Sequence, residues 1–379
     1  MKNYFFLIGL IVLLGCTQKR QIPPYLLVEL DKPDVSSIHL QYLTSHFEAF
    51  DTAVVTKNGL WEFTTDSVPA GFYQLVVDGQ PRLRLVLSDG APARIAIKGT
   101  NSPVRIVGSA EAKALQEIEI QVAQLSTEIR TVTAAFSDSL PTDRFYHVKD
   151  SLLDQITHLK ANCRTKLEDL YRSHSQSLVQ LAILYQQAGN HSLFDPLQDA
   201  SFYYSTDSVL MQRYPDYQPV VDFHQRVDSL RQLKRMVDRT SAGNKMPVFE
   251  LPNAWGEKIS YAGYQDRNTL IVTWSSTSEA CRQATRDLWH LTRTLRQHGL
   301  AIVMISLDTD ASAWKKAIRD DRLPFVHLAD LEGMASPIVN QLGITHQPLF
   351  WVVDSAGIIQ KRTTEVTEAL NALSLIMKN

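Results

Sequence analysis

The chain has 379 residues, and its 38 Lys and Arg against 40 Asp and Glu give a formal net charge of -2. Nothing in this balance points to nucleic acid, and no metal-ligand spacing, phosphate loop or other cofactor motif stands out. The hydrophobic fraction of 44% is ordinary for a globular protein, and the length has room for two or three domains.

The first twenty residues are typical of an export leader. Lys2 supplies a positive charge, and Tyr4 to Leu14 is an apolar stretch too short for a membrane-spanning helix. Leu13-Leu14-Gly15-Cys16 resembles the bacterial lipoprotein processing box, in which the cysteine is cut and acylated. That resemblance implies a signal peptide over residues 1–16, membrane lipid held through Cys16, and an outer-membrane location facing the periplasm. An ordinary secretory signal and a surface-facing orientation are the alternatives.

Residues 21–108 predict a small antiparallel β domain. Short strand-like runs alternate with turn signals, and the strongest are Asn58-Gly59 and Asp78-Gly79, which favour tight hairpins. The aromatic residues Trp61 and Phe63 are expected to pack in the hairpin core rather than to form a partner surface. With its closing Val107-Gly108-Ser109, the segment resembles a β domain of unknown function that precedes thioredoxin modules in bacterial lipoproteins.

Residues 109–242 predict a helical connector. Two apolar stripes, one from Leu115 to Val132 and one from Val148 to Leu170, repeat at spacings of three and four and indicate an antiparallel helical hairpin. Cys163 lies in the second stripe and is expected to be a small hydrophobic residue in the seam. A further short helix is expected over Ser177–Ala188. The stripes also allow a homodimer through a coiled-coil arm, as an alternative to packing within one chain.

Residues 243–379 alternate strands and helices, which predicts a mixed central sheet and an overall multidomain α+β chain. A buried strand over Leu270–Thr273 is followed by Trp274-Ser-Ser-Thr, and then by a helix that starts near Cys281. Much later, Gln347-Pro348 precedes another apolar strand.

These landmarks resemble the membrane-anchored TlpA/ResA-like thiol–disulfide reductases, thioredoxin-fold members of the AhpC/TSA-redoxin superfamily. In that alignment Cys281 takes the place of the second cysteine of the Cys-x-x-Cys motif, and Ser278 stands where the first should be. The resemblance implies a cis proline at Pro348. It also implies a substrate groove lined by four residues, which are Trp274, Glu279, Gln347 and Pro348.

Serine at position 278 cannot form a disulfide, so the two-cysteine cycle is excluded within this chain. The leading hypothesis is a degenerate thioredoxin-like protein that binds protein segments at the Pro348 groove. One alternative is a residual oxidoreductase in which Cys281 reacts and an external thiol resolves the product. Another is a structural scaffold that works through its helical arm.

Overall fold

A computed structural model describes residues 23–377 with some gaps, and for residues 135–137, 145–150 and 191 it describes the backbone alone. The gaps are 32–34, 57, 66, 89, 91, 99–103, 138–144, 190, 293–296 and 298. The predicted leader with Cys16 lies outside the described residues. The chain divides into two compact units, Met1–Gln225 and Arg226–Asn379. The predicted β domain and most of the predicted helical connector therefore belong to one packed unit.

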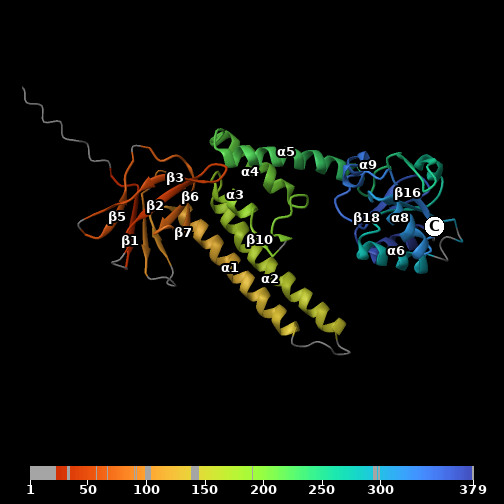
Figure 1. The fold of residues 1–379 in the computed structure, drawn as a ribbon, viewed down its shortest axis with the longest axis horizontal. Coiled ribbons are helices and arrows are strands. Elements are labelled where there is room, and N and C mark those ends of the chain that lie inside the picture. The colour runs from red at the N-terminus through yellow and green to blue at the C-terminus, as the bar shows by residue number, and fades with distance from the viewer. Residues whose placement is uncertain are drawn as a thin grey trace, which may run out of the picture. The chain divides into compact units, whose positions relative to one another are not determined.

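The first unit begins with two β-sheets that enclose one apolar core (Figure 1). One sheet has the strand order β4-β5-β1-β8-β9 and the other β3-β2-β6-β7. Side chains that point inward from both sheets, such as Leu26, Leu40 and Ile95, are fully buried. The strands are β1 Leu26–Leu30, β2 Ile38–Leu43, β3 Phe47–Thr52, β4 Val54–Val55, β5 Leu60–Phe63, β6 Gly71–Val77, β7 Gln80–Leu87, β8 Ala93–Ile97 and β9 Arg105–Val107.

Both predicted hairpins are confirmed. β4 pairs antiparallel with β5 around Asn58-Gly59, and β6 pairs antiparallel with β7 around Asp78-Gly79. Asp78 and Gly79 have positive φ angles of 48° and 76°, which a two-residue hairpin turn requires. Phe63 is fully buried and Trp61 packs against the same core, as expected.

The expectation of a purely antiparallel β domain is wrong in one place. β1 pairs antiparallel with β5 but parallel with β8, with Val28 opposite Ile95. The physical reason is that β8 follows β7 of the other sheet. No hairpin joins β8 to β1, so local turn chemistry does not set the relative direction of these two strands.

The predicted helical hairpin is formed by α1 (Ala110–Ser137) and α2 (Phe145–Ser173). Leu125 and Leu167 are buried between the helices, and the thiol of Cys163 lies 3.8 Å from the carbonyl oxygen of Gln121. Burial raises the pKa of the Cys163 thiol. Cys163 therefore behaves as the small core residue that its place in the apolar stripe predicts.

The predicted helix over Ser177–Ala188 is too long. α3 spans only Val179–Leu184, and the chain then forms a small hairpin of β10 (Gln187–Ala188) and β11 (His191–Ser192) before α4 (Ala200–Arg213). The apolar run that suggested a longer helix ends at Leu184, and Gly189, with φ of 64°, makes the hairpin turn.

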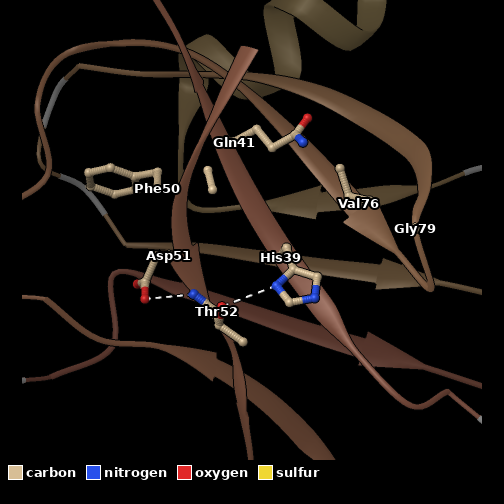
Figure 2. Close-up of a pocket in the computed structure, with 8 residues that line it drawn as sticks. His39, Gln41, Phe50, Asp51, Thr52, Val76 and Gly79 are labelled. Atoms are coloured by element: carbon tan, nitrogen blue, oxygen red, sulfur yellow. Dashed lines mark hydrogen bonds between the residues drawn. The ribbon is translucent and has the colours of Figure 1, made fainter.

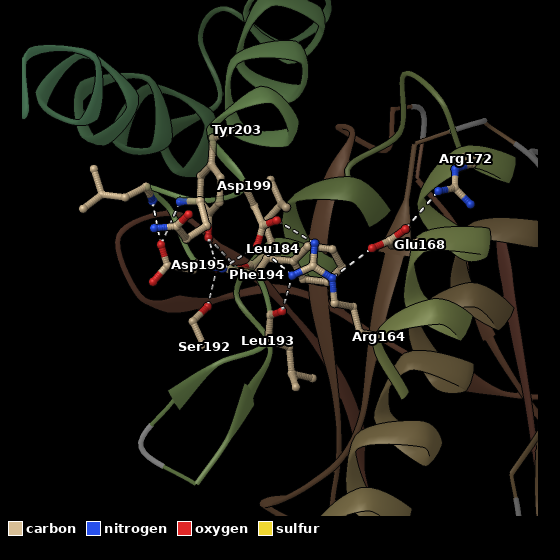
Figure 3. Close-up of polar contacts among 12 residues, drawn as sticks. Arg164, Glu168, Arg172, Leu184, Ser192, Leu193, Phe194, Asp195, Asp199 and Tyr203 are labelled. Atoms are coloured by element: carbon tan, nitrogen blue, oxygen red, sulfur yellow. Dashed lines mark hydrogen bonds and ion pairs between the residues drawn. The ribbon is translucent and has the colours of Figure 1, made fainter. Parts of the chain in front are cut away.

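A polar network around Arg164 anchors the segment between this hairpin and α4 (Figure 3). The Arg164 guanidinium donates to both carboxylate oxygens of Asp199 at 2.8 and 2.6 Å, and to Glu168 at 2.9 Å. It also lies 4.9 Å from the centre of the Phe194 ring. These contacts hold the pKa of Arg164 above its usual value, chiefly through the hydrogen bonds to Asp199. The network joins α2 to the start of α4.

The second unit is built on a five-stranded mixed sheet with the strand order β16-β15-β14-β17-β18. β14 is parallel to β15 and antiparallel to β17, and all six of its residues are buried because both faces of the sheet are covered. A separate hairpin, β12–β13, precedes the sheet. The strands are β12 Glu250–Pro252, β13 Lys258–Ser260, β14 Thr269–Trp274, β15 Ala301–Ser306, β16 Val326–Leu328, β17 Leu349–Val353 and β18 Ile359–Thr363.

Helices cover both faces of this sheet (Figure 1). On one face α6, α8 and α10 pack against Val272, Met304 and Val352, and on the other α9 packs with Ile271 and Trp351. The end of α5 (Gln218–Arg239) also belongs to this unit, where the Thr240 hydroxyl donates to the carbonyl of Leu342. The remaining helices are α6 Glu279–Leu291, α8 Ala311–Asp320, α9 Pro337–Leu342 and α10 Val366–Ile376.

Candidate functional site

Ser278 lies at the start of α6, just beyond the end of β14. It is the N-cap residue of the helix, with extended backbone angles, and its hydroxyl oxygen accepts a hydrogen bond from the backbone N–H of Cys281 at 3.3 Å. Serine is among the preferred N-cap residues because its short side chain can accept from the otherwise unpaired N–H groups of the first turn. The side chain that replaces the first cysteine thus caps the helix.

Cys281 lies within the first turn of α6 and is fully buried. Its side chain belongs to the apolar core that also contains Trp274 and Leu288. The sulfur is a free thiol, as is that of Cys163, which is also buried. A thiol must reach its target to exchange disulfides, so burial makes Cys281 a poor nucleophile in this conformation.

The peptide bond between Gln347 and Pro348 is cis, as the sequence predicts. β17 begins at the next residue, where Leu349 pairs with Thr273 of β14. This register places Pro348 beside the end of β14, from which the chain continues through Ser275 to Ser278. The topology therefore brings the helix cap and the proline loop to one edge of the sheet. The role of this edge as a binding groove stays a prediction.

Asp308 also lies at this edge, two residues after the end of β15. Its carboxylate accepts hydrogen bonds from the hydroxyls of Ser275 and Ser276, both at 2.9 Å, and from the backbone N–H of Ser276 at 3.0 Å. The Ser306 hydroxyl donates to the same carboxylate at 2.5 Å. Asp308 is only 4% exposed. The sequence reasoning missed this residue, because its partners lie about thirty positions earlier in the chain.

A family model described as AhpC/TSA family matches residues 242–362. The C-terminal module is an AhpC/TSA domain. Its sheet and helices form the thioredoxin-like fold that the sequence predicts. No curated protein matches the chain.

Solved structures of thiol–disulfide oxidoreductases are similar to the AhpC/TSA domain. One is a C-terminal domain from Bacteroides thetaiotaomicron named for this activity, with 28% identity and a TM-score of 0.35, covering 37% of this chain and 98% of that one. Another is a thiol-disulfide oxidoreductase from Bacteroides fragilis, with 30% identity and a TM-score of 0.32, covering 34% of this chain and 95% of that one.

Trp274 does not line the predicted groove of the AhpC/TSA domain. It is fully buried, and its indole N–H has no hydrogen-bond partner among the described residues. Alternation along β14 turns its side chain to the face covered by α6, α8 and α10, together with Leu270 and Val272. In the Trp-Cys-x-x-Cys motif that the chain resembles, the tryptophan directly precedes the first cysteine. Here the exposed Thr277 occupies that place, and Trp274 lies three residues before it.

Glu279 is exposed, and its carboxylate is engaged along α6. The Arg286 guanidinium donates to it at 2.6 Å and also approaches Asp321, which in turn forms two hydrogen bonds with Arg282 at 2.7 and 2.8 Å. The Arg282 guanidinium holds the pKa of Asp321 below its usual value. A carboxylate in the first turn also suits the positive end of the helix dipole, so Glu279 has a structural reason for its position.

Met334 is an exposed apolar residue at this edge that the sequence did not single out. Its side chain is 61% exposed, and its sulfur lies 3.9 Å from the amide nitrogen of Gln347. Gln347 and Pro348 themselves are half-buried. His346, which precedes them, is exposed and bonds to the hydroxyl of Thr345 at 2.9 Å. Nothing in the spacing of the sequence shows that Met334 and Gln347 lie side by side.

A cavity of about 540 Å³ lies in the other unit, on β2, β3 and the β6–β7 turn (Figure 2). Its polar groups bond to neighbouring protein atoms: His39 to the Thr52 hydroxyl at 3.1 Å, and Asp51 to the backbone N–H of Thr52 and to the Tyr25 hydroxyl. His39, Asp51 and Thr52 are thus engaged within the protein. The cavity therefore indicates no ligand class.

Two other searches concern the described residues alone. In that part of the chain no group of three or more His, Cys, Asp and Glu side chains is placed to hold a metal ion. No helix there combines the length and apolar character that a membrane crossing needs.

Proposed function

We propose that the AhpC/TSA domain binds extended protein segments at the edge formed by Ser278, Gln347 and Pro348, without turning over disulfides. The observation that carries this proposal is the state of the two motif positions. Ser278 holds the place of the attacking cysteine but caps α6, and Cys281 is fully buried. The peptide bond before Pro348 is cis, as the resemblance implies.

The chemistry of the two positions supports a binding role. Thiol–disulfide exchange starts with a thiolate that attacks a disulfide sulfur, and a second thiol then releases the product. A serine hydroxyl has nothing like the acidity of a thiol and forms no S–S bond. Cys281 alone lacks both access and a resolving partner within this chain. The alternative, an oxidoreductase that uses Cys281, therefore needs a movement of α6 to expose the thiol and an external thiol to release the product.

The surface around Pro348 supports recognition of a protein segment. Thr277 and Met334 are exposed and Gln347 is half-buried, so both polar and apolar side chains are accessible at this edge. An exposed methionine adapts its shape to different apolar partners. A segment laid along the edge would contact Met334 with an apolar side chain and Gln347 with a polar group.

The first test measures disulfide exchange with an unfolded protein that contains a disulfide bond. It compares three proteins: the native chain, Cys281→Ser and Ser278→Cys. We expect the native chain to be inert and Ser278→Cys to reduce the disulfide, because that change restores the missing nucleophile at the helix start. Activity of the native chain that is lost in Cys281→Ser would contradict the proposal and favour the one-cysteine redox function.

The second test measures binding directly. The probe is reduced and alkylated α-lactalbumin, a permanently unfolded chain without free thiols, titrated against the native protein and Met334→Asp. The matched control is Leu375→Asp on α10, because Leu375 is 68% exposed and Met334 61%. We expect Met334→Asp to weaken binding about tenfold, the loss of one well-placed apolar contact, and Leu375→Asp to leave it unchanged. Equal effects of the two variants would place binding elsewhere.

The leader motif supports a location for this activity. We propose that the protein is exported and anchored through an acylated Cys16 to the outer membrane, facing the periplasm. One acyl chain holds a protein only reversibly, and several hold it stably. Metabolic labelling with a clickable palmitate analogue tests this, with Cys16→Ser as the control. Label that persists in Cys16→Ser, or no label in either form, would remove the lipid anchor.

A further inference from the structure

The carboxylate of Asp308 is almost fully buried and receives four hydrogen-bond donors, three hydroxyl groups and one backbone N–H. Burying a charge is costly unless hydrogen bonds compensate for the lost water. Among the described residues no Lys, Arg or His forms an ion pair with it. The serine-rich connection before α6 therefore supplies most of the compensation for this charge.

Three of the four donors belong to Ser275 and Ser276, which lie in the connection between β14 and α6. Further bonds hold the connection itself: the Ser275 hydroxyl lies 2.9 Å from that of Thr277, and the N–H of Ser278 donates to the Ser275 carbonyl at 3.3 Å. Only Thr277 separates the held residues from Ser278. A short chain of contacts thus links Asp308 to Ser278.

A local role for Asp308, in ending β15 or capping α8, does not explain the contacts of its carboxylate. Its own N–H donates to the Ser306 hydroxyl at 3.1 Å, which ends β15 without any need for the carboxylate. The next helix, α8, has a separate cap, because Asp310 accepts from the N–H groups of Ser312 and Ala313. The contacts of the Asp308 carboxylate reach across to the neighbouring connection instead.

We propose that Asp308 is a positioning residue, which holds the residue at position 278 against the start of α6. The inference rests on the proposed function, because it takes this edge as the binding site of the domain. It predicts that the capping geometry of Ser278, and the properties of any group placed there, depend on the hydrogen bonds that Asp308 accepts. It makes no use of a bound ligand.

The test replaces Ser278 by a thiol as a reporter. The full-length chain in mild detergent carries Ser278→Cys together with Cys16→Ala, Cys163→Ala and Cys281→Ala, so the introduced thiol is the sole cysteine. Its pKa is measured from the pH dependence of alkylation by iodoacetamide. A thiolate held at a helix N-terminus has a lowered pKa, so this value reports whether position 278 stays at the start of α6.

Asp308→Ala, Asp308→Asn and Asp310→Ala are then added to this background. Removing a nearby negative charge lowers a thiol pKa, whereas loss of position at the helix raises it. We expect Asp308→Ala to raise the pKa of this thiol by about one unit, which slows alkylation about tenfold at a pH below both pKa values. Asp308→Asn also removes the charge but keeps an acceptor for the N–H of Ser276. The pKa of the reporter thiol should therefore be lower with Asp308→Asn than with Asp308→Ala. Asp310→Ala, which loses a helix cap of similar kind, should leave the pKa unchanged.

Two outcomes overturn the proposal: a pKa that is unchanged or lowered in Asp308→Ala, or an equal rise in Asp310→Ala. If Asp308→Ala does not fold, Ser275→Ala with Ser276→Ala removes two of the donors and leaves the carboxylate in place. The same upward shift is then expected, and its absence counts against the proposal. The thiol reports position without any protein segment bound, so this result is independent of the binding proposal.

Discussion

His327 makes the stability of the C-terminal unit depend on pH. The residue is 7% exposed, its Nε2 lies 3.2 Å from the carbonyl oxygen of Leu323, and its Nδ1 has no partner among the described residues. The rings of Trp274 and Phe325 lie nearby, with centroids at 5.8 and 6.3 Å. Burial lowers the pKa of His327 to about 4, because this environment disfavours the charged imidazolium.

The direction of the effect follows from linkage. An unfolded histidine has a pKa of about 6.5, so at lower pH the unfolded chain binds a proton that the folded unit takes up only near pH 4. Stability is therefore fully present above pH 6.5 and is lost as the pH falls toward 4. At pH 4.5 these two values give a loss of about 2.5 kcal/mol, and at pH 7.5 almost none.

The assay is urea unfolding followed by tryptophan fluorescence at pH 7.5 and 4.5. Five of the six tryptophans, all except Trp61, lie in the second unit, so the signal reports that unit. His327→Gln keeps an N–H donor but does not titrate, and it should lose about 2.5 kcal/mol less than the native chain between the two pH values. Equal losses in the two proteins would show that His327 does not bind the proton responsible.

Three further predictions concern stability at neutral pH, each measured as the free energy of unfolding in urea. Gly343→Ala should cost about 2 kcal/mol or more, because φ is 60° and a Cβ atom would lie 2.8 Å from the backbone nitrogen of Val237; an unchanged value would refute the close approach. Arg164→Ala should cost about 2 kcal/mol through the loss of its contacts with the 11%-exposed Asp199, whereas the 63%-exposed Arg172→Ala should cost less than about 0.5 kcal/mol; equal costs would argue against the network of Figure 3. Ser278→Ala should cost about 1 kcal/mol as the loss of an N-cap, and Ser278→Gly only a few tenths; no loss in Ser278→Ala would mean that the hydroxyl does not cap α6.

Features with a local cause were predicted well. The hairpin at Asp78-Gly79 depends on two residues that tolerate positive φ, and α6 corresponds to the helical apolar pattern that begins near Cys281. The buried strand before Ser278 was visible as an apolar run with turn signals beyond it. In each case a few consecutive residues carry the physical cause.

Features that depend on distant partners were not predicted. The sequence does not single out Asp308, because two of the three hydroxyls that donate to it belong to the neighbouring connection. Met334 meets Gln347 only after the sheet has formed. The family motif predicts that Trp274 lines the groove, but its place at the end of β14 turns its side chain into the core. The parallel pairing of β1 with β8 likewise follows from the path of the chain between two sheets.

Ser278 uses the unpaired N–H groups at the start of α6 to cap the helix, whereas a cysteine there would use them to stabilise a thiolate. The unpaired N–H groups of a first helical turn can stabilise a thiolate, or they can donate to a capping hydroxyl. In this protein the Ser278 hydroxyl accepts from the N–H of Cys281, so that donor is already engaged. A nucleophile placed at position 278 would require the same donor to turn to the sulfur. In Ser278→Cys the capping hydroxyl is absent, and the N–H of Cys281 is free to stabilise a thiolate instead. Stability and disulfide chemistry should accordingly change in opposite directions when Ser278→Cys is made.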